Sequence, residues 1–402
     1  MNILTVATFA FPDHYGGAER VLADANARLA ARGHRVTLLT GNVADGPPRE
    51  RLGDIDVHRY PVDRSSPAQF WRSVWKGVRG ALQAGVGADA DVLSLHQIIS
   101  AAAAVAPRGA GCRARVLTFH APYHLEFLAR FRAGNEQGSA PLAARAVASV
   151  MARADRYVVR RSQEVLVLSD YMRGHLSRLD KAAGERAVFA PGGVDLERFA
   201  PPRDADDQGR AARVAGVPND GLPLLLTVRR LVQRMGVADL IEALAAMSTP
   251  ARLAIAGDGD LRADLEQQAA ALGVSERVVF LGRVPDDTLT DLYRAADAFV
   301  LPTRSLEGFG MVTAEALASG LPVVATDAGA NAEVLAGVDA ARIVPASDPK
   351  ALATALDTLL ADPAALASAQ RSARAHAEKH LGWEHHIDAF EQAAERSQRA
   401  AR

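Results

Sequence analysis

Short apolar runs alternate with longer amphipathic segments along the whole chain. The runs lie at 3–8, 36–40, 92–95, 116–119 and 165–168 in the first half, and at 224–228, 253–256, 278–281, 298–301 and 323–325 in the second half. Continuous apolar runs of this length are typical of strands that are buried on both faces of a parallel sheet, and the segments between them are typical of crossover helices. The pattern therefore predicts an α/β fold.

A polar, proline-rich stretch, PPRDADDQG, separates the two series of runs and lies within residues 199–221. A chain of 402 residues is also longer than one ordinary core supports. We therefore predict two Rossmann-like parallel-sheet domains, at 1–200 and 201–382, and a C-terminal helix within 383–402. A short helix is expected at 205–217. Because ligands of open parallel sheets bind beyond the carboxyl ends of the strands, two such domains facing each other would form a central cleft.

Charge and cysteine content exclude several classes of protein. The chain has 46 basic and 47 acidic side chains, so a global attraction to nucleic acid is not expected. Cys112 is the only cysteine, which excludes an intrachain disulfide and a cysteine-based metal cluster. The start, MNILTVATFAFPDHYGG, lacks a basic leader and a cleavage site, and no apolar run approaches the roughly 20 residues of a membrane span. We expect a cytoplasmic protein.

Residues 305–322, SLEGFGMVTAEALASGLP, carry the clearest functional signal. Glu307 and Glu315 lie on either side of a Gly-Phe-Gly turn that opens a helical pattern. The N–H groups at a helix start favour an anion, and carboxylates accept hydrogen bonds from hydroxyl groups. We predict that the helix start at 310–313 faces a leaving diphosphate, that Glu307 holds hydroxyls of a transferred sugar and that Glu315 holds those of a ribose. These are the parts of a nucleotide sugar.

Two features follow predicted strands of the first half. Gly16 and Gly17 precede a helical pattern, and paired glycines let a phosphate approach the backbone at a helix start. A plain turn explains them at least as well, and the spacing is not that of a dinucleotide fingerprint. His120 closes the strand at 116–119, where it would face the cleft, although a structural histidine is the more common case.

Two further features follow predicted strands of the second half. Arg230 and Arg234 come after the strand at 224–228 together with Arg229, and arginines suit a diphosphate; a solvated loop is the alternative. Gly257 and Asp258 belong to a Gly-Asp-Gly-Asp turn that permits close approach to a flat base. We interpret its two aspartates as a turn signature, because a divalent metal usually needs more oxygen ligands.

Residues 70–82 are helical in period and carry two tryptophans beside basic residues. Such a helix could lie on a membrane that contains a lipid acceptor, which would place the protein at the inner membrane face. We favour the alternative, in which the helix packs on the sheet of the first domain.

A series of sequence blocks then suggests a family. In chain order the blocks are GGAER at 16–20, VLSDYMRGHL at 167–176, APGGVDLERF at 190–199, GDGDLRADLE at 257–266, VVFLGRVPDDTLTDLYRAADAFVLPT at 278–303 and EGFGMVTAEALASGLPVVATDAG at 307–329. Together they resemble the retaining glycosyltransferases of family 4, which share the two-domain GT-B fold. The resemblance covers nearly the whole chain.

The resemblance implies roles for individual residues. The donor-binding positions that it implies or supports are Gly16, Gly17, Arg230, Arg234, Gly257, Asp258, Arg283, Glu307, Phe309, Gly310, Met311, Val312 and Glu315. Arg230 corresponds to a phosphate-binding arginine whose usual lysine partner is replaced here by Met235, so that Arg234 would have to supply the second charge. Arg283 lies where the family places the nucleobase. In the family, the terminal helix crosses back to the first domain. The helical pattern at 383–390 is compatible with such a helix.

The sequence and the resemblance together predict retaining, metal-independent transfer of a hexose-type sugar from a nucleoside diphosphate to an acceptor hydroxyl. Glu307, His120 and Arg230 are the predicted catalytic residues, and no cofactor is expected. The acceptor, which is a glycan, lipid-linked sugar, natural product or small polyol, would contact loops near 11–15 and 123–136. One alternative is a sugar-nucleotide epimerase or hydrolase of the same fold, which would consume the donor without an acceptor. Another is a two-domain sugar-binding protein, which would not need the diphosphate arginines.

Overall fold

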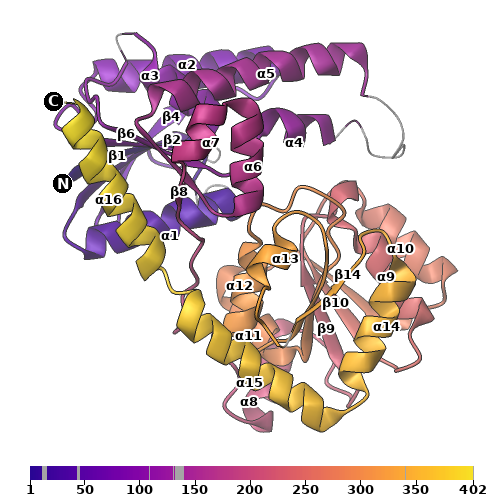
Figure 1. Cartoon of the computed structure of the whole chain (residues 1–402). Coiled ribbons are helices and arrows are strands. Elements are labelled where there is room, and N and C mark those ends of the chain that lie inside the picture. Colours follow the sequence, from indigo (N-terminus) through magenta and orange to yellow (C-terminus); the bar gives the residue numbers. More distant parts are fainter. Residues whose placement is uncertain are drawn as a thin grey trace. The chain divides into compact units, whose positions relative to one another are not determined.

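The computed structural model describes residues 1–10, 16–42, 46–107, 109–129, 131, 140–339 and 341–401. The chain divides into two compact units. Unit 1 comprises Met1–Gly192 and Trp383–Arg402, and unit 2 comprises Gly193–Gly382. Each unit is built on a parallel sheet with helices on its faces (Figure 1). The predicted α/β class with two Rossmann-like domains is therefore confirmed.

Within the described residues, unit 1 forms an eight-stranded sheet with the order β3-β4-β2-β1-β5-β6-β7-β8. Its strands are β1 (Asn2–Val6), β2 (Arg35–Asn42), β3 (Arg49–Leu52), β4 (Ile55–Pro61), β5 (Val92–Leu95), β6 (Arg115–Phe119), β7 (Glu164–Val167) and β8 (Val188–Phe189). Neighbouring strands are parallel except for β3 and β4. Since β1 lies between β2 and β5, the strand order reverses there, and ligands of such sheets bind at this switch point.

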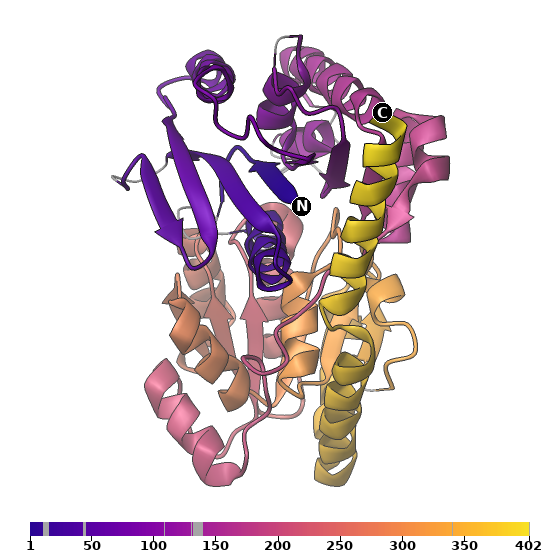
Figure 2. The same ribbon diagram turned by 90° about the vertical axis from the view of Figure 1, so that its left-hand side faces the viewer.

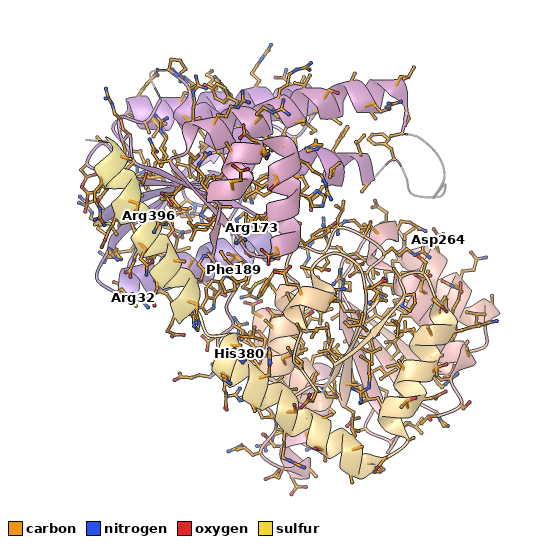
Figure 3. All side chains as sticks on the ribbon, viewed as in Figure 1. Arg32, Arg173, Phe189, Asp264, His380 and Arg396 are labelled. Atoms are coloured by element: carbon orange, nitrogen blue, oxygen red, sulfur yellow. The ribbon has the colours of Figure 1, made fainter. Side chains whose placement is uncertain are left out.

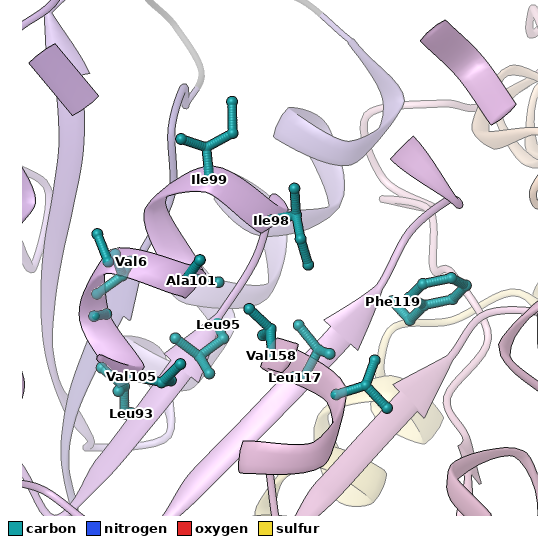
Figure 4. Packing of buried hydrophobic residues seen from close by; sticks show 14 of the residues in the cluster. Val6, Leu93, Leu95, Ile98, Ile99, Ala101, Val105, Leu117, Phe119 and Val158 are labelled. Atoms are coloured by element: carbon teal, nitrogen blue, oxygen red, sulfur yellow. The ribbon is translucent and has the colours of Figure 1, made fainter. Parts of the chain in front are cut away.

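Helices cover both faces of this sheet. They are α1 (Gly17–Ala31), α2 (Pro67–Gln83), α3 (Ile98–Val105), α4 (Tyr123–Ala129), α5 (Leu142–Arg161), α6 (Asp170–Leu179), α7 (Lys181–Arg186) and α16 (Glu384–Ala401). Helices α2, α3 and α5 pack on one face, where Leu95 and Leu117 of adjacent strands meet Val158 of α5 (Figure 4). Helix α1 contributes Leu22 to the cluster on the opposite face.

Helix α2 contains the residues for which membrane contact was considered. Val74 and Val78 are fully buried in the core of unit 1, and Trp71 packs against that core, whereas Trp75 is 41% exposed. The helix thus packs on the sheet, as the sequence favours, and a membrane contact remains a prediction. Within the part of the chain that the structure describes, every helix is too short or too polar to span a bilayer.

The C-terminal helix α16 is part of unit 1, where it contacts β6 and β7 (Figures 1 and 2). Its buried face includes Ile387 and Phe390. Its outer face forms ion pairs with residues far away in sequence. Arg396 pairs with Glu164 at 2.8 Å, and Asp388 pairs at 2.6 Å with Arg32, the C-cap of α1. Both arginines are labelled in Figure 3.

Unit 2 forms a six-stranded parallel sheet, within the described residues, with the order β11-β10-β9-β12-β13-β14. Its strands are β9 (Leu224–Val228), β10 (Arg252–Ala256), β11 (Val278–Gly282), β12 (Ala298–Leu301), β13 (Val323–Thr326) and β14 (Ala341–Val344). Its helices are α8 (Ala205–Ala215), η1 (Gln233–Met235), α9 (Val237–Ala246), α10 (Arg262–Ala271), η2 (Ser275–Arg277), α11 (Asp286–Ala295), α12 (Met311–Ala318), α13 (Asn331–Val334), α14 (Pro349–Leu360) and α15 (Pro363–His380). Because β9 lies between β10 and β12, this sheet also has a switch point.

The first domain limit differs from the prediction. Residues 193–200 belong to unit 2 rather than to the first domain. Val194 N–H donates to the carbonyl of Leu381 at 2.8 Å, and the Arg374 guanidinium donates to the carbonyls of Leu196 and Phe199 at 3.1 and 2.8 Å. These hydrogen bonds tie residues 194–199, which precede the polar linker, to α15 and its C-cap, a contact that local composition does not indicate.

Candidate functional site

Glu307 lies in the loop between β12 and α12, at the carboxyl edge of the sheet of unit 2. Its Oε2 accepts one hydrogen bond from Nη2 of Arg229 at 2.7 Å and another from the hydroxyl of Thr303 at 3.0 Å. Arg229 directly follows β9, and Thr303 follows the adjacent strand β12. The three side chains therefore meet at the switch point of the sheet, where ligands of this fold bind.

The charge of Glu307 is set by its surroundings. Burial acts to raise the pKa of this carboxyl, but the charge and hydrogen bond of Arg229, the charge of Arg234 and the hydrogen bond of Thr303 outweigh it, and the pKa of Glu307 is lowered. The side chain is therefore ionised at neutral pH. An ionised carboxylate only accepts hydrogen bonds, so it is complementary to hydroxyl groups of a sugar.

The backbone at Glu307 is tightly held. Leu306 has a φ of 58°, which is uncommon for a residue with a Cβ, and its carbonyl accepts a hydrogen bond from Nη1 of Arg234 at 3.3 Å. The carbonyl of Glu307 accepts from Ala330 N–H at 2.9 Å. A Cβ at Gly329 would lie 2.3 Å from that same oxygen. The loop after β13 thus fixes the position of Glu307 and requires glycine at 329.

Helix α12 begins directly after the Gly-Phe-Gly turn. Gly310 precedes it with a φ of 80°, a conformation that glycine adopts without strain. Thr313 N–H donates to the carbonyl of Gly310 at 2.8 Å. The first N–H groups of any helix have no acceptor within it, and in α12 these belong to Met311 and Val312. Phe309 in the turn is buried. Diphosphate binding by the amides of Met311 and Val312 remains a prediction.

Glu315 lies one turn further along α12 and is 5% exposed. Its Oε2 accepts a hydrogen bond from the hydroxyl of Tyr293 on α11 at 2.8 Å, and the same hydroxyl lies 3.3 Å from the carbonyl of Val312. A ribose hydroxyl would therefore have to share this carboxylate with Tyr293. Ribose binding by Glu315 remains a prediction. Tyr293 was not singled out from the sequence, because an aromatic residue in a helical pattern is typical of a core.

The arginines after β9 lie in different environments. Arg229 is 7% exposed and contacts Glu307, whereas its neighbour Arg230 is exposed. Arg234 lies on η1, half-buried, beside the carbonyl of Leu306. Adjacent side chains of an extended chain point to opposite sides, so local sequence does not show which of two arginines faces the interior. The residue that contacts Glu307 is thus Arg229, and not one of the two arginines that the sequence selected.

Backbone contacts join the loops after β9 and β10. Arg229 N–H donates to the carbonyl of Ala256 at 2.8 Å, and Leu231 N–H donates to the carbonyl of Asp258 at 3.0 Å. Gly257 has a φ of 138°, and a Cβ there would lie 1.8 Å from the carbonyl oxygen of Arg229. Glycine at 257 is therefore required by the close approach of two backbones.

The predicted base-binding residues Asp258 and Arg283 lie in the loops after β10 and β11. Asp258 and Arg283 are both exposed. Oδ1 of Asp258 accepts from Gly259 N–H at 2.9 Å, which is the geometry of a turn. Within the described residues, no group of three or more His, Cys, Asp or Glu side chains is arranged to hold a metal ion.

In unit 1, His120 follows β6 and pairs with His96, which follows the adjacent strand β5. Nε2 of His120 lies 2.8 Å from Nδ1 of His96, whose Nε2 lies 3.2 Å from the hydroxyl of Ser94. Burial lowers the pKa of His120 to about 4, while Glu19 opposes this effect. Burial and the nearby His120 and His386 lower the pKa of His96. Both rings are therefore neutral at neutral pH, and His120 is suited to hydrogen bonding rather than to carrying charge.

These histidines should make folding sensitive to acid. His120 has a pKa of about 4 in the folded protein against an ordinary 6.5, so the unfolded chain binds the proton more readily. Stability should then fall as pH decreases from about 7 to about 4, by on the order of 3 kcal/mol for this ring. His96 and His386, whose pKa values burial also lowers, should add to the loss. Urea unfolding across this pH range should show a flatter dependence for His120→Asn than for the parent. Equal slopes would contradict this assignment.

The start of α1 contains the predicted glycine pair, with Gly16 as N-cap and Gly17 as first residue. A Cβ at Gly16 would lie 2.2 Å from Oε2 of Glu19, and Oε1 of Glu19 accepts from Nε2 of Gln97 at 2.7 Å. A carboxylate thus already lies at this helix start, so a diphosphate could bind there only if Glu19 turned away. Of the predicted acceptor loops at 11–15 and 123–136, residues 11–15, 130 and 132–136 lie outside the described residues, whereas Tyr123–Ala129 form the helix α4 instead of a loop.

Comparisons with known proteins identify the family to which the chain belongs. Residues 15–198 match the family described as Glycosyltransferase Family 4, and residues 210–379 match Glycosyl transferases group 1. D-inositol 3-phosphate glycosyltransferase 1 from Catenulispora acidiphila is 33% identical over 393 residues, which are 93% of this chain and 89% of that protein. The chain belongs to the family 4 glycosyltransferases. The predicted family and the predicted glycosyltransferase activity are thereby confirmed.

Other similar proteins agree with this placement. The GDP-mannose-dependent alpha-(1-6)-phosphatidylinositol monomannoside mannosyltransferase of Mycolicibacterium smegmatis is 36% identical over 210 residues, or 50% of this chain and 53% of that protein. Sucrose-phosphate synthase from Thermosynechococcus elongatus superimposes with a TM-score of 0.83 at 22% identity over 99% of both chains. Anabaena HepE in complex with UDP and glucose gives 0.73 at 22% identity, over 98% of this chain and 99% of that one. The structural likeness confirms the GT-B fold.

Proposed function

We propose that this family 4 glycosyltransferase moves a hexose-type sugar from a nucleoside diphosphate to an acceptor hydroxyl, with retention at the anomeric carbon. The observation that carries the proposal is the ionised Glu307, held by Arg229 and Thr303 at the sheet switch point. It lies four residues before the helix start whose amides suit a diphosphate. A nucleotide sugar has hydroxyls and a diphosphate on either side of the bond that breaks, which matches this order of groups.

The proposed step breaks the bond between the anomeric carbon and the phosphate oxygen. The leaving diphosphate gains negative charge. Arg230, Arg234 and the start of α12 would stabilise this charge. The acceptor oxygen bonds to the carbon on the same face, and the departing phosphate oxygen takes the acceptor's proton. Glu307 holds the sugar and forms no covalent bond to it. We propose that arginines and amides balance the charge without a metal ion or other cofactor.

For the acceptor we infer an inositol-type polyol, either free or lipid-linked. The names of the relatives support this choice, since one is named for D-inositol 3-phosphate and another for a phosphatidylinositol monomannoside. The second is also named as GDP-mannose-dependent, so GDP-mannose is a leading donor. A lipid-linked acceptor would bring a cytoplasmic enzyme to the inner membrane face.

A donor screen tests the function. UDP-, GDP- and ADP-sugars are compared by thermal shift, and one of them should raise the melting temperature by several degrees. With that donor and inositol phosphate, NMR of the product should show the anomeric configuration of the donor, and excess chelator should not reduce the rate. An inverted product would contradict retention, and loss of activity that manganese restores would contradict metal independence. Complete donor consumption without an acceptor would favour the epimerase or hydrolase alternative.

A further inference from the structure

We propose that Arg229 is the positioning residue of Glu307. It also supplies the positive charge that the family's usual lysine would supply at position 235, where this chain has Met235. The proposal rests on the proposed function, in which the Glu307 carboxylate holds the transferred sugar. It concerns a residue that contacts Glu307 and has no assigned role in donor binding.

The contact geometry supports this role. Nη2 of Arg229 lies 2.7 Å from Oε2 of Glu307 and 2.6 Å from the sulfur of Met235. The Arg229 side chain is 4% exposed, and Met235 is 8% exposed. The tips of residues 229 and 235 thus meet at one buried point beside Glu307, and only the first of them is charged.

The two donors on Glu307 also fix its orientation. Arg229 and Thr303 both donate to the same oxygen, Oε2, and the two oxygens of a carboxylate point apart. The hydrogen bonds therefore hold Oε2 in place, and they leave Oε1 as the oxygen that would accept from a sugar hydroxyl. A buried carboxylate that loses its cation becomes protonated or turns toward water, and either change would remove this acceptor.

Neighbouring arginines do not duplicate the contact. Arg304 is engaged by Asp239 through two hydrogen bonds of 2.8 and 2.6 Å, and Arg234 donates to the carbonyl of Leu306. The backbone of Arg229 is fixed by its hydrogen bond to Ala256 and by the close approach of Gly257. Arg229 can therefore reach Glu307 without any movement of the sheet edge.

Moving the cation from one residue to the other tests the proposal. Arg229→Met should lower kcat/KM about 100-fold, mainly through kcat, because the sugar is no longer held in a productive position. Met235→Lys should lower it about tenfold, because two cations then share one site. The double variant Arg229→Met with Met235→Lys should recover to within about tenfold of the parent, since a lysine at 235 passes through the position of the methionine sulfur. Arg229→Lys should retain more activity than Arg229→Met.

Arg374→Met is the matched control. This arginine donates to carbonyls of Leu196, Phe199 and Ala318, so its loss should lower stability while the folded protein keeps the parent kcat/KM. Parent activity in Arg229→Met would overturn the proposal. So would a folded double variant that is no more active than Arg229→Met.

A second readout is independent of catalysis. Urea unfolding of the parent, Arg229→Met, Glu307→Gln and their combination should show non-additive effects, with at least tenfold coupling between the unfolding constants. Additive effects would overturn the positioning role even if the enzyme is active. A parent that transfers no sugar but shows this coupling would count against the proposed function alone.

Discussion

Replacing Glu307 by glutamine will lower sugar transfer about 10³-fold in kcat while nucleoside diphosphate affinity stays within about threefold of the parent. Glutamine keeps the size of the side chain but removes the charge that pairs with Arg229 and replaces one acceptor oxygen by a donor. The diphosphate is expected on the amides of α12, which this change does not touch. Turnover with the identified donor and calorimetric titration with the matching nucleoside diphosphate measure the two effects.

Glu266→Gln is the control for this change. Glu266 lies on α10 and pairs with Arg262 at 2.9 Å, with both side chains exposed, so its replacement should leave both measurements unchanged. Parent-like turnover in Glu307→Gln would show that Glu307 has no role in sugar transfer. Equal losses of turnover and diphosphate affinity would show instead that the loop between β12 and α12 no longer holds its shape.

Replacing Gly257 by alanine will lower the free energy of unfolding by about 4 kcal/mol or more. The added Cβ would lie 1.8 Å from the carbonyl oxygen of Arg229, and the φ of 138° is itself unfavourable for alanine. Because the crowded atom belongs to the backbone, no side-chain rotation can relieve the contact. Urea unfolding monitored by circular dichroism measures the loss.

Gly273→Ala separates the two contributions. Gly273 also has a positive φ, 68°, but a Cβ there would have no neighbour within 4 Å, so only the backbone cost of about 1 kcal/mol is expected. Similar losses in the two variants would mean that the approach of the loops after β9 and β10 is not tight.

Much of the fold could be read from periodicity. The runs predicted at 92–95, 224–228 and 298–301 coincide with β5, β9 and β12, because strands buried on both faces must be apolar throughout. The strands β3, β4, β8 and β14 were missed. β3 (RERL), β8 (VF) and β14 (ARIV) lie at sheet edges, where one side of a strand needs no apolar residues, and β4 (IDVHRYP), next to β3, is interrupted by charged residues. The continuous apolar run that marks a strand is therefore lost where a strand is not buried along its whole length.

The site was only partly readable. Glu307 and Gly310 could be selected because a helix start and its flanking acid are local features. His96 was missed because nothing local shows that the end of β5 lies beside the end of β6, where it pairs with His120. The same limit applies to Thr303, whose hydroxyl meets Glu307 only through the course of the loop after β12.

By itself the sequence determined the α/β class, the helix start at α12 and the family, since each depends on residues that are close together in the chain. Tertiary structure alone decided that Arg229, and neither of the other two arginines of its loop, contacts Glu307. The physical reason is that this ion pair joins residues from the ends of two adjacent strands, so it depends on strand order and on which side of an extended chain faces the interior.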